Sequence, residues 1–392
     1  MKVTSLEQFK LEVNKALLSR DIRINLKYKT TTFSYSSENR RWEIKENKLL
    51  HCDWGPAAVY EDGIQEWWCM NQRHRENGPA IVRLNGTEEW WYMGHRHRTD
   101  GPAIIYPDGK QEWWDMGYLH RTDGPAIIHP DGTEEWRVEG QRHRDGGPAV
   151  IYPDGMQEWY CFDNLYKITR PDGSEEWYRR GLLHRTDGPA VIEPDGAQKW
   201  YYMGKEHRID GPAVIEPDGT QKWCLFGELH RTDGPAIIKP DGTEEWWYMG
   251  HRHRTDGPAI ISPDGTEEWW CMGKKHRIDG PAVIEPDGTQ KWYYLNRLHR
   301  TDGPAVIRPD STQEWWYMGQ KHRTDGPAII RPDDTEEWWC MGKKHRIDGP
   351  AVIEPDGTQK WYYLNKLHRT DGPAVMHSDG TEEWWQCDKK VK

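Results

Sequence analysis

Gly-Pro-Ala elements recur at a fixed spacing of 23 residues, and this period constrains the fold more than any other feature of the chain. The element begins at fourteen glycines from Gly55 to Gly372, and the single longer step, 41 residues, lies between Gly147 and Gly188. A fixed period of this size is typical of a repeat array, in which each unit packs only on its neighbours. We therefore predict an all-β array of about fifteen 23-residue units over 51–387, with a truncated unit near 164–187.

Two turns are legible in each unit. The first is Pro-Asp-Gly, as at Pro194-Asp195-Gly196, where proline suits the second position of a type I turn and glycine supplies a positive φ. The second surrounds the glycine after the aromatic run, as at 203–206. These turns predict an antiparallel hairpin with strands at about 198–203 and 207–215, closed by a three-residue bulged loop.

Charge patterning between units supports this register. With a three-residue loop, the residue before proline and the residue before the repeat tryptophan are diagonal neighbours, which favours opposite charges. Four units pair glutamate with lysine in this way, and the other eleven place glutamate before tryptophan opposite a cation or an uncharged residue. The first set is Glu193/Lys199, Glu216/Lys222, Glu285/Lys291 and Glu354/Lys360, and the cations of the second are Arg83, Arg170, Lys239, Arg308 and Arg331.

The same register places Trp200 opposite Ala190 and Tyr202 opposite Gly188. Small residues there are expected to leave room for the indole, and Pro189 must interrupt pairing because it lacks an N–H. We accordingly assign a structural role in the repeat to Trp90, Trp113, Trp200, Trp246, Gly101, Gly188, Pro189, Asp195 and Gly196.

Residues 1–50 differ from the array and are predicted to form a small α+β cap. Apolar residues at spacings of three and four predict a helix over 5–20 with Thr4 or Ser5 as N-cap, and 21–26 and 31–35 alternate like strands. The alternative is that this segment is a partner-docking or targeting module. The basic tail at 388–392 is expected to fray.

Composition narrows the function classes. The net charge of −11 makes the chain a poor match for nucleic acid or an anionic membrane. Cys69, Cys161, Cys271 and Cys340 occupy a position where other units carry tyrosine, so we interpret them as space-filling thiols. With no start typical of a signal peptide and no long apolar run, the sequence favours a reducing, cytoplasmic compartment.

The recurring His-Arg-x-Asp, as at 97–100, is the only array motif with catalytic residue types. Identical copies on a regular ladder do not converge on one pocket, so we predict no enzyme and no cofactor. Aspartate is expected to secure the turn before Gly-Pro, and arginine to lie over an indole or to pair with glutamate. Metal binding by stacked histidines is the weaker alternative.

In most units the repeat tryptophan is followed directly by another tryptophan or a tyrosine, which we call the second aromatic. Stacking within and between units is one interpretation, and an aromatic platform for sugar rings or quaternary ammonium groups is the other. The candidate binding surface consists of Trp91, Trp247, Trp270, Trp316, Trp339, Arg98 and Arg254.

The units resemble MORN-type repeats in a divergent form. The resemblance rests on Gly94-x-x-His97, Asp100-Gly101, Asp108-Gly109 and Trp113, and it covers 51–387. The chain differs from the usual MORN pattern because it carries Gly-Pro-Ala, a repeat tryptophan and Pro-Asp-Gly in the turn. The resemblance implies a hairpin array used as a protein-interaction scaffold. A fainter likeness, at 218–223 and 291–295, is to the choline-binding repeats of bacterial surface proteins.

These observations favour a non-enzymatic scaffold that binds a protein partner or self-associates. The alternatives are a carbohydrate- or choline-type ligand-binding array, and an antitoxin- or immunity-like partner protein.

Overall fold

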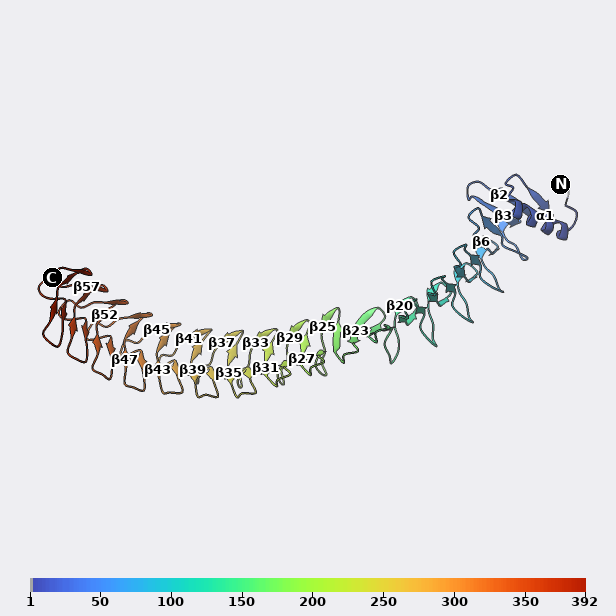
Figure 1. Ribbon diagram of the computed structural model, residues 1–392. Coiled ribbons are helices and arrows are strands. Elements are labelled where there is room, and N and C mark those ends of the chain that lie inside the picture. Colours follow the sequence, from blue (N-terminus) through green and yellow to red (C-terminus); the bar gives the residue numbers. More distant parts are fainter. Residues whose placement is uncertain (1–2) are drawn as a thin grey trace. The chain divides into compact units, whose positions relative to one another are not determined.

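The computed structural model describes residues 3–392 and confirms an all-β hairpin array with one helix at its N-terminus (Figure 1). The chain divides into two compact units, the first comprising residues up to 185 with 190–194, and the second comprising 186–189 with 195–392. Within each unit, hairpins follow one another in sequence order. Across residues 3–392, no helix has the length and apolar character needed to cross a membrane.

The N-terminal helix α1 spans Leu6–Ser19 as predicted, and Ser5 is its N-cap because its side chain accepts a hydrogen bond from Gln8 N. Phe9 and Val13 on its buried face have no exposed surface. They pack in one core with Phe33 and with residues from the start of the array, including Ala57.

Three strands continue this segment: β1 (Leu26–Tyr28), β2 (Thr31–Ser36) and β3 (Arg41–Glu46). The strand predicted over 31–35 is confirmed, whereas 21–26 enters a strand only at its last residue. β3 pairs with β5 (Ala58–Tyr60) of the first repeat, so the N-terminal sheet runs directly into the array.

Each regular repeat contains four short strands in two places. Two strands join the main ladder, as β13 (Ile104–Ile105) and β14 (Gln111–Glu112), and β14 pairs onward with β17 (Ile127–Ile128) of the next repeat. We call these ladder strands. The other two form a small separate hairpin, as β11 (Trp91–Tyr92) with β12 (His95–Arg96), which we call the side hairpin.

This arrangement corrects the two long strands expected over 198–203 and 207–215. The first is split at Trp200 into β27 (Gln198–Lys199) and β28 (Tyr201–Tyr202). Tyr202 pairs with Lys205 of the side hairpin instead of lying opposite Gly188.

The second expected strand survives only as β30 (Val214–Ile215), because the residues before it form a loop that contains Pro212, which lacks an N–H for pairing. We call this segment, His207–Ala213 and its equivalents such as His97–Ala103, the clasp loop. Gly188 and Pro189 lie half-buried in the clasp loop that precedes β26 (Val191–Ile192).

The bulged turn and its register are confirmed. Glu216 N donates to Thr220 O at 2.9 Å, Gly219 has φ 90°, and β30 pairs with β31 (Gln221–Lys222) with Val214 opposite Lys222. In the equivalent turn, Gly196 has φ 92° and Ala197 N donates to Asp195 Oδ1 at 3.0 Å.

The predicted diagonal ion pairs follow from this register. Lys222 Nζ lies 2.7 Å from Glu216 Oε1, and Lys291 and Lys360 contact Glu285 and Glu354 in the same way. The opposite polarity is present at Arg83–Glu89, Arg170–Glu176, Lys239–Glu245, Arg308–Glu314 and Arg331–Glu337.

The truncated unit has longer strands. β22 (Gln157–Cys161), β23 (Asn164–Thr169) and β24 (Glu175–Arg179) pair in succession, with one irregularity between Trp159 and Tyr160. No clasp loop interrupts this stretch.

The C-terminal tail, which we expect to fray, contributes the second strand of the last side hairpin. β60 (Trp385–Gln386) pairs with β61 (Lys389–Lys390). Lys390 Nζ lies 5.7 Å from the centre of the Trp385 ring, so the basic tail covers the last second aromatic.

Candidate functional site

Wherever a clasp loop carries an arginine after its histidine, this arginine lies over the repeat tryptophan of its own repeat, which confirms one of the two roles expected for it. The Arg98 guanidinium carbon is 4.0 Å from the Trp90 ring centre. Arg98 Nε donates to Asp100 Oδ1 at 2.7 Å, and its Nη1 donates to Pro102 O at 3.2 Å. Aspartate therefore holds the arginine, and this hydrogen bond lowers the pKa of Asp100.

The same contact recurs at every repeat tryptophan given a structural role. The arginines over Trp113, Trp200 and Trp246 are Arg121 at 4.2 Å, Arg208 at 4.3 Å and Arg254 at 4.0 Å.

The glycine of Gly-Pro-Ala makes room for this arginine. A Cβ built on Gly101 would lie 3.1 Å from Arg98 Cζ, and on Gly124 it would lie 2.8 Å from Arg121 Cζ. The sequence interpretation, that the glycine clears the indole, named another neighbour: the atoms nearest to the added Cβ belong to the guanidinium, which itself lies over the indole.

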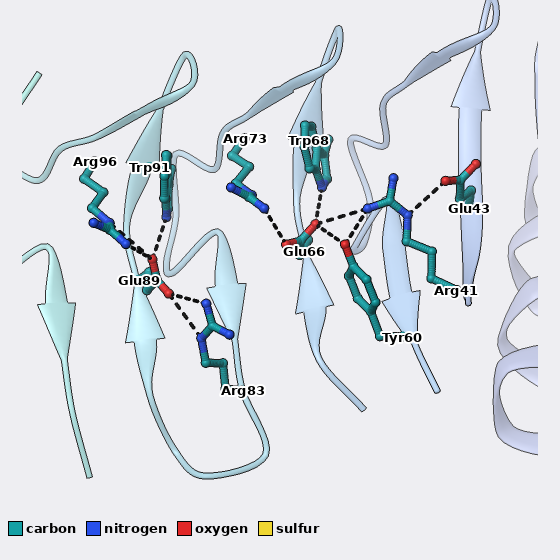
Figure 2. A network of polar contacts seen from close by, with 10 residues as sticks. All are labelled: Arg41, Glu43, Tyr60, Glu66, Trp68, Arg73, Arg83, Glu89, Trp91 and Arg96. Atoms are coloured by element: carbon teal, nitrogen blue, oxygen red, sulfur yellow. Dashed lines mark hydrogen bonds and ion pairs between the residues drawn. The ribbon is translucent and has the colours of Figure 1, made fainter. Parts of the chain in front are cut away.

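A buried carboxylate organises the residues on the other side of the ladder (Figure 2). Glu89 is 3% exposed, and its oxygens lie 2.8 Å from Arg83 Nη2 and 3.3 Å from Arg96 Nη2. Trp91 Nε1 donates to Glu89 Oε2 at 3.2 Å. A buried carboxylate is stable in this place because two cations and an indole N–H surround it.

The equivalent carboxylate in the second unit is Glu245. Burial raises its pKa, but the hydrogen bond from Lys239 and the charge of Arg252 outweigh this effect, so the net pKa is lowered. The network is therefore charged at neutral pH.

The second aromatics alternate with cations from the side hairpins. The Arg73 guanidinium carbon lies 5.1 Å from the ring centres of both Trp68 and Trp91. Arg96 lies 5.2 Å from Trp91 and 5.0 Å from Trp114. Each indole in this column thus has a guanidinium of the chain itself on its face.

The five tryptophans of the candidate binding surface all belong to such columns and are half-buried. In the second unit the contacts are Arg252 with Trp247 and Trp270, Lys275 with Trp270, and Lys321 with Trp316 and Trp339. Arg98 and Arg254, the two arginines of that surface, lie on the repeat tryptophans instead, so the structure does not bring the seven residues together.

The histidine that begins each clasp loop can contact the side hairpin of the next repeat, a contact that the sequence interpretation missed. Met93 N donates to His74 Nδ1 at 3.3 Å, and the Tyr92 ring lies 4.9 Å from His74 and 6.0 Å from His97. Because Nδ1 accepts, the neutral ring carries its proton on Nε2. In the sequence, this contact could have been predicted from the constant spacing between the histidine and the turn of the next side hairpin.

A second kind of link appears where the side-hairpin turn contains asparagine. Asn296 Oδ1 accepts from Lys275 N at 2.6 Å, and Nδ1 of His276 is buried without a hydrogen-bond partner. Neighbouring repeats are therefore also linked through histidine, through asparagine or through aspartate, the last at Asp163 and Asp388.

Open grooves lie between successive clasp loops. One of about 600 Å³ is lined by 300–304 of one loop, 322–325 of the next, and the aromatic rings of Trp315 and Tyr317. The grooves at 276–302 and 346–371 have volumes of about 640 and 610 Å³. Another, of about 490 Å³, is lined by residues of 52–77. These recurring grooves are the candidate site.

Across residues 3–392, no group of three His, Cys, Asp or Glu side chains is placed to hold a metal ion. All seven cysteines have free thiols, and the four repeat-position cysteines range from half-buried to exposed. Burial raises the pKa of Cys224 to about 12 and that of Cys52 to about 11.

Comparison with known proteins adds no family. No protein-family model matches the chain, and no curated protein matches it. The resemblance to MORN-type repeats therefore stays a hypothesis that rests on the residues quoted for it.

Proposed function

We propose that the protein is a non-enzymatic scaffold that binds a protein partner along the grooves between its clasp loops. The observation that carries this proposal is the recurrence of one groove at equivalent positions. The grooves at 276–302 and 346–371 are lined by equivalent residues. Equivalent sites on one chain gain affinity through avidity even where each is weak.

Accessible aromatic rings support a protein partner. Tyr294, Tyr317 and Tyr363 line the three grooves of the second unit and are 44%, 45% and 50% exposed. Tyrosine is enriched at protein interfaces because it offers a large ring and a polar hydroxyl at low entropic cost. The tryptophan rings, by contrast, already carry cations of the chain.

The test is a native pull-down with mass spectrometry, using the wild type and a triple variant, Tyr294→Ser, Tyr317→Ser and Tyr363→Ser. A partner retained by the wild type and lost by the folded variant, and then rebound after separate purification, supports the proposal. Equal recovery by both proteins contradicts it. Light scattering on the same material tests self-association as the binding mode.

Titration with glycans and choline, followed by tryptophan fluorescence, tests the ligand-binding alternative. A saturable response with several equivalent sites would replace the scaffold proposal.

A further inference from the structure

The charges of each clasp loop lie at different depths. Asp302 and Asp325, which line one groove on opposite sides, have side chains that are 79% and 78% exposed. Their arginine partners, Arg300 and Arg323, are only 22% and 21% exposed because each lies on an indole. Both arginines also line the groove, but the carboxylates are the more exposed charges at its edges.

These carboxylates are ionised at neutral pH. The hydrogen bond from Arg300 lowers the pKa of Asp302, and the hydrogen bond from Arg323 lowers that of Asp325.

Apolar surface lies beside these carboxylates. Tyr294 lines one groove together with Ile278, and Tyr363 lines the equivalent groove with Ile347. The two isoleucines are 90% and 89% exposed, at a position where most clasp loops carry threonine. An apolar wall beside a carboxylate suits a lysine or arginine side chain, whose stem is apolar and whose end is charged. A tyrosine face adds a cation–π contact.

The spacing of the grooves suits an extended chain. Each repeat contributes two ladder strands, so neighbouring grooves lie roughly 9.6 Å apart at about 4.8 Å per strand. In a polyproline II segment, three residues cover about 9.3 Å and every third side chain points the same way, whereas in a β-strand it would point to the opposite face. Every third side chain of a polyproline II segment would thus meet an equivalent groove.

We propose that the grooves of the second unit bind an extended, basic segment of the partner protein, with a lysine or arginine at every third position. This inference rests on the proposed scaffold function and names the chemistry of its partner.

The test uses fluorescence anisotropy with labelled peptides of about eighteen residues. One carries lysine at every third position among serine and glycine. The second has the same composition with the lysines clustered, and the third has glutamate in place of lysine. We expect the evenly spaced peptide to bind the full chain about tenfold more tightly than the clustered one, and the acidic peptide not to bind. Added salt should weaken the binding.

A charge variant locates the binding. Asparagine at Asp279, Asp302, Asp325 and Asp348 keeps an Oδ1 that can accept from the clasp arginine but removes the charge, and it should weaken binding about tenfold. The matched control removes four charges from the turns that begin with Pro-Asp in the same region, which do not line these grooves: Asp287, Asp310, Asp333 and Asp356 to asparagine.

The control should bind as the wild type does, and circular dichroism should show both variants folded. Equal loss in the two variants, or equal affinity for spaced and clustered peptides, overturns the proposal. A partner from the pull-down that binds through a neutral or acidic segment, and is lost with the tyrosine variant, would overturn the basic segment but leave the scaffold function standing.

Discussion

Two stretches of the first unit share one ladder and differ in a single loop. In the regular repeat from Trp90 to Glu112, the chain leaves the ladder at the tryptophan, forms a side hairpin and a clasp loop, and returns at β13. In the truncated repeat, β22, β23 and β24 run through the same region as strands of five, six and five residues.

The truncated repeat replaces the clasp arginine with a lysine on the strand itself. Lys167 lies opposite both Trp159 and Trp177, with its Nζ 5.0 and 4.7 Å from their ring centres. The ladder therefore forms without the clasp loop. The other repeats retain a loop that the sheet does not require, which is why we place the function there.

Removal of the central carboxylate should have the largest effect. In Glu89→Ala, the half-buried groups Arg83, Arg96 and Trp91 Nε1 lose their shared partner, and we expect local stability to fall by about 2 kcal/mol. Hydrogen exchange at the amides of the neighbouring ladder strands measures this. Glu176→Ala in the truncated repeat is the comparison, where a more exposed carboxylate should cost about 1 kcal/mol. Equal losses would contradict the distinction between the two regions.

Acid should weaken the regular repeats through the same carboxylates. The folded pKa of Glu245 is lowered below its ordinary value of 4.5, so its stabilisation is complete above that pH and is lost as the pH falls through the folded value. Thermal midpoints should drop between about pH 5 and pH 3. Glu245→Gln should show a shallower fall, and an unchanged slope would show that this network does not respond to acid.

A methyl group added at the clasp glycine should displace the arginine. Gly124→Ala places Cβ within 2.8 Å of Arg121 Cζ, and we expect a loss of about 1–2 kcal/mol from the lost stacking and overpacking. Gly55→Ala, where no neighbour lies within 4 Å, is the matched control and should stay within about 0.5 kcal/mol of wild type. Hydrogen exchange of the Ala126 amide measures the loss of stability in Gly124→Ala.

Loss of a whole clasp loop should cost little stability. Replacement of 114–135 by residues 160–176 converts a regular repeat into a copy of the truncated one. We expect an unchanged circular dichroism spectrum and a thermal midpoint within about 3 °C of wild type. Unfolding of the graft would show that the loop is required by the sheet after all.

Thiol reactivity should differ without any change in stability. Cys161 of the truncated repeat is exposed, whereas burial raises the pKa of Cys224 to about 12. Iodoacetamide near neutral pH should label Cys161 well before Cys224. Mass spectrometry of the digested protein measures the order, and simultaneous labelling would indicate that the regular repeats open locally.

Sequence reasoning predicted the period, the bulged turn, the diagonal ion pairs and an arginine over the indole, because each leaves a trace within one unit or in its variation between units. It failed at the strand boundaries. We expected the strand to continue through the Trp-Trp and Trp-Tyr pairs, but the ladder ends at the first aromatic because the second aromatic begins the side hairpin.

One further signal in the sequence was available. Side hairpins that carry tryptophan pair it with arginine or lysine in almost every case, whereas those that carry tyrosine at the same position pair it with leucine or glutamate. Tryptophan Nε1 donates to the buried glutamate, so units with lysine before the repeat tryptophan offer no such acceptor. This covariation predicts the network of Figure 2, whereas the histidine link and the grooves depend on how neighbouring repeats contact one another.

The hydrogen bonds between ladder strands join residues that are close in the sequence, which affects how the chain folds during synthesis. Trp113 N donates to Ala126 O, and Ala126 N donates to Glu135 O. The partner of each of these ladder residues is therefore synthesised shortly after it. Short sequence separations between paired residues favour rapid, local folding that propagates from repeat to repeat. The array can therefore fold co-translationally, repeat by repeat, before its C-terminal repeats have been synthesised.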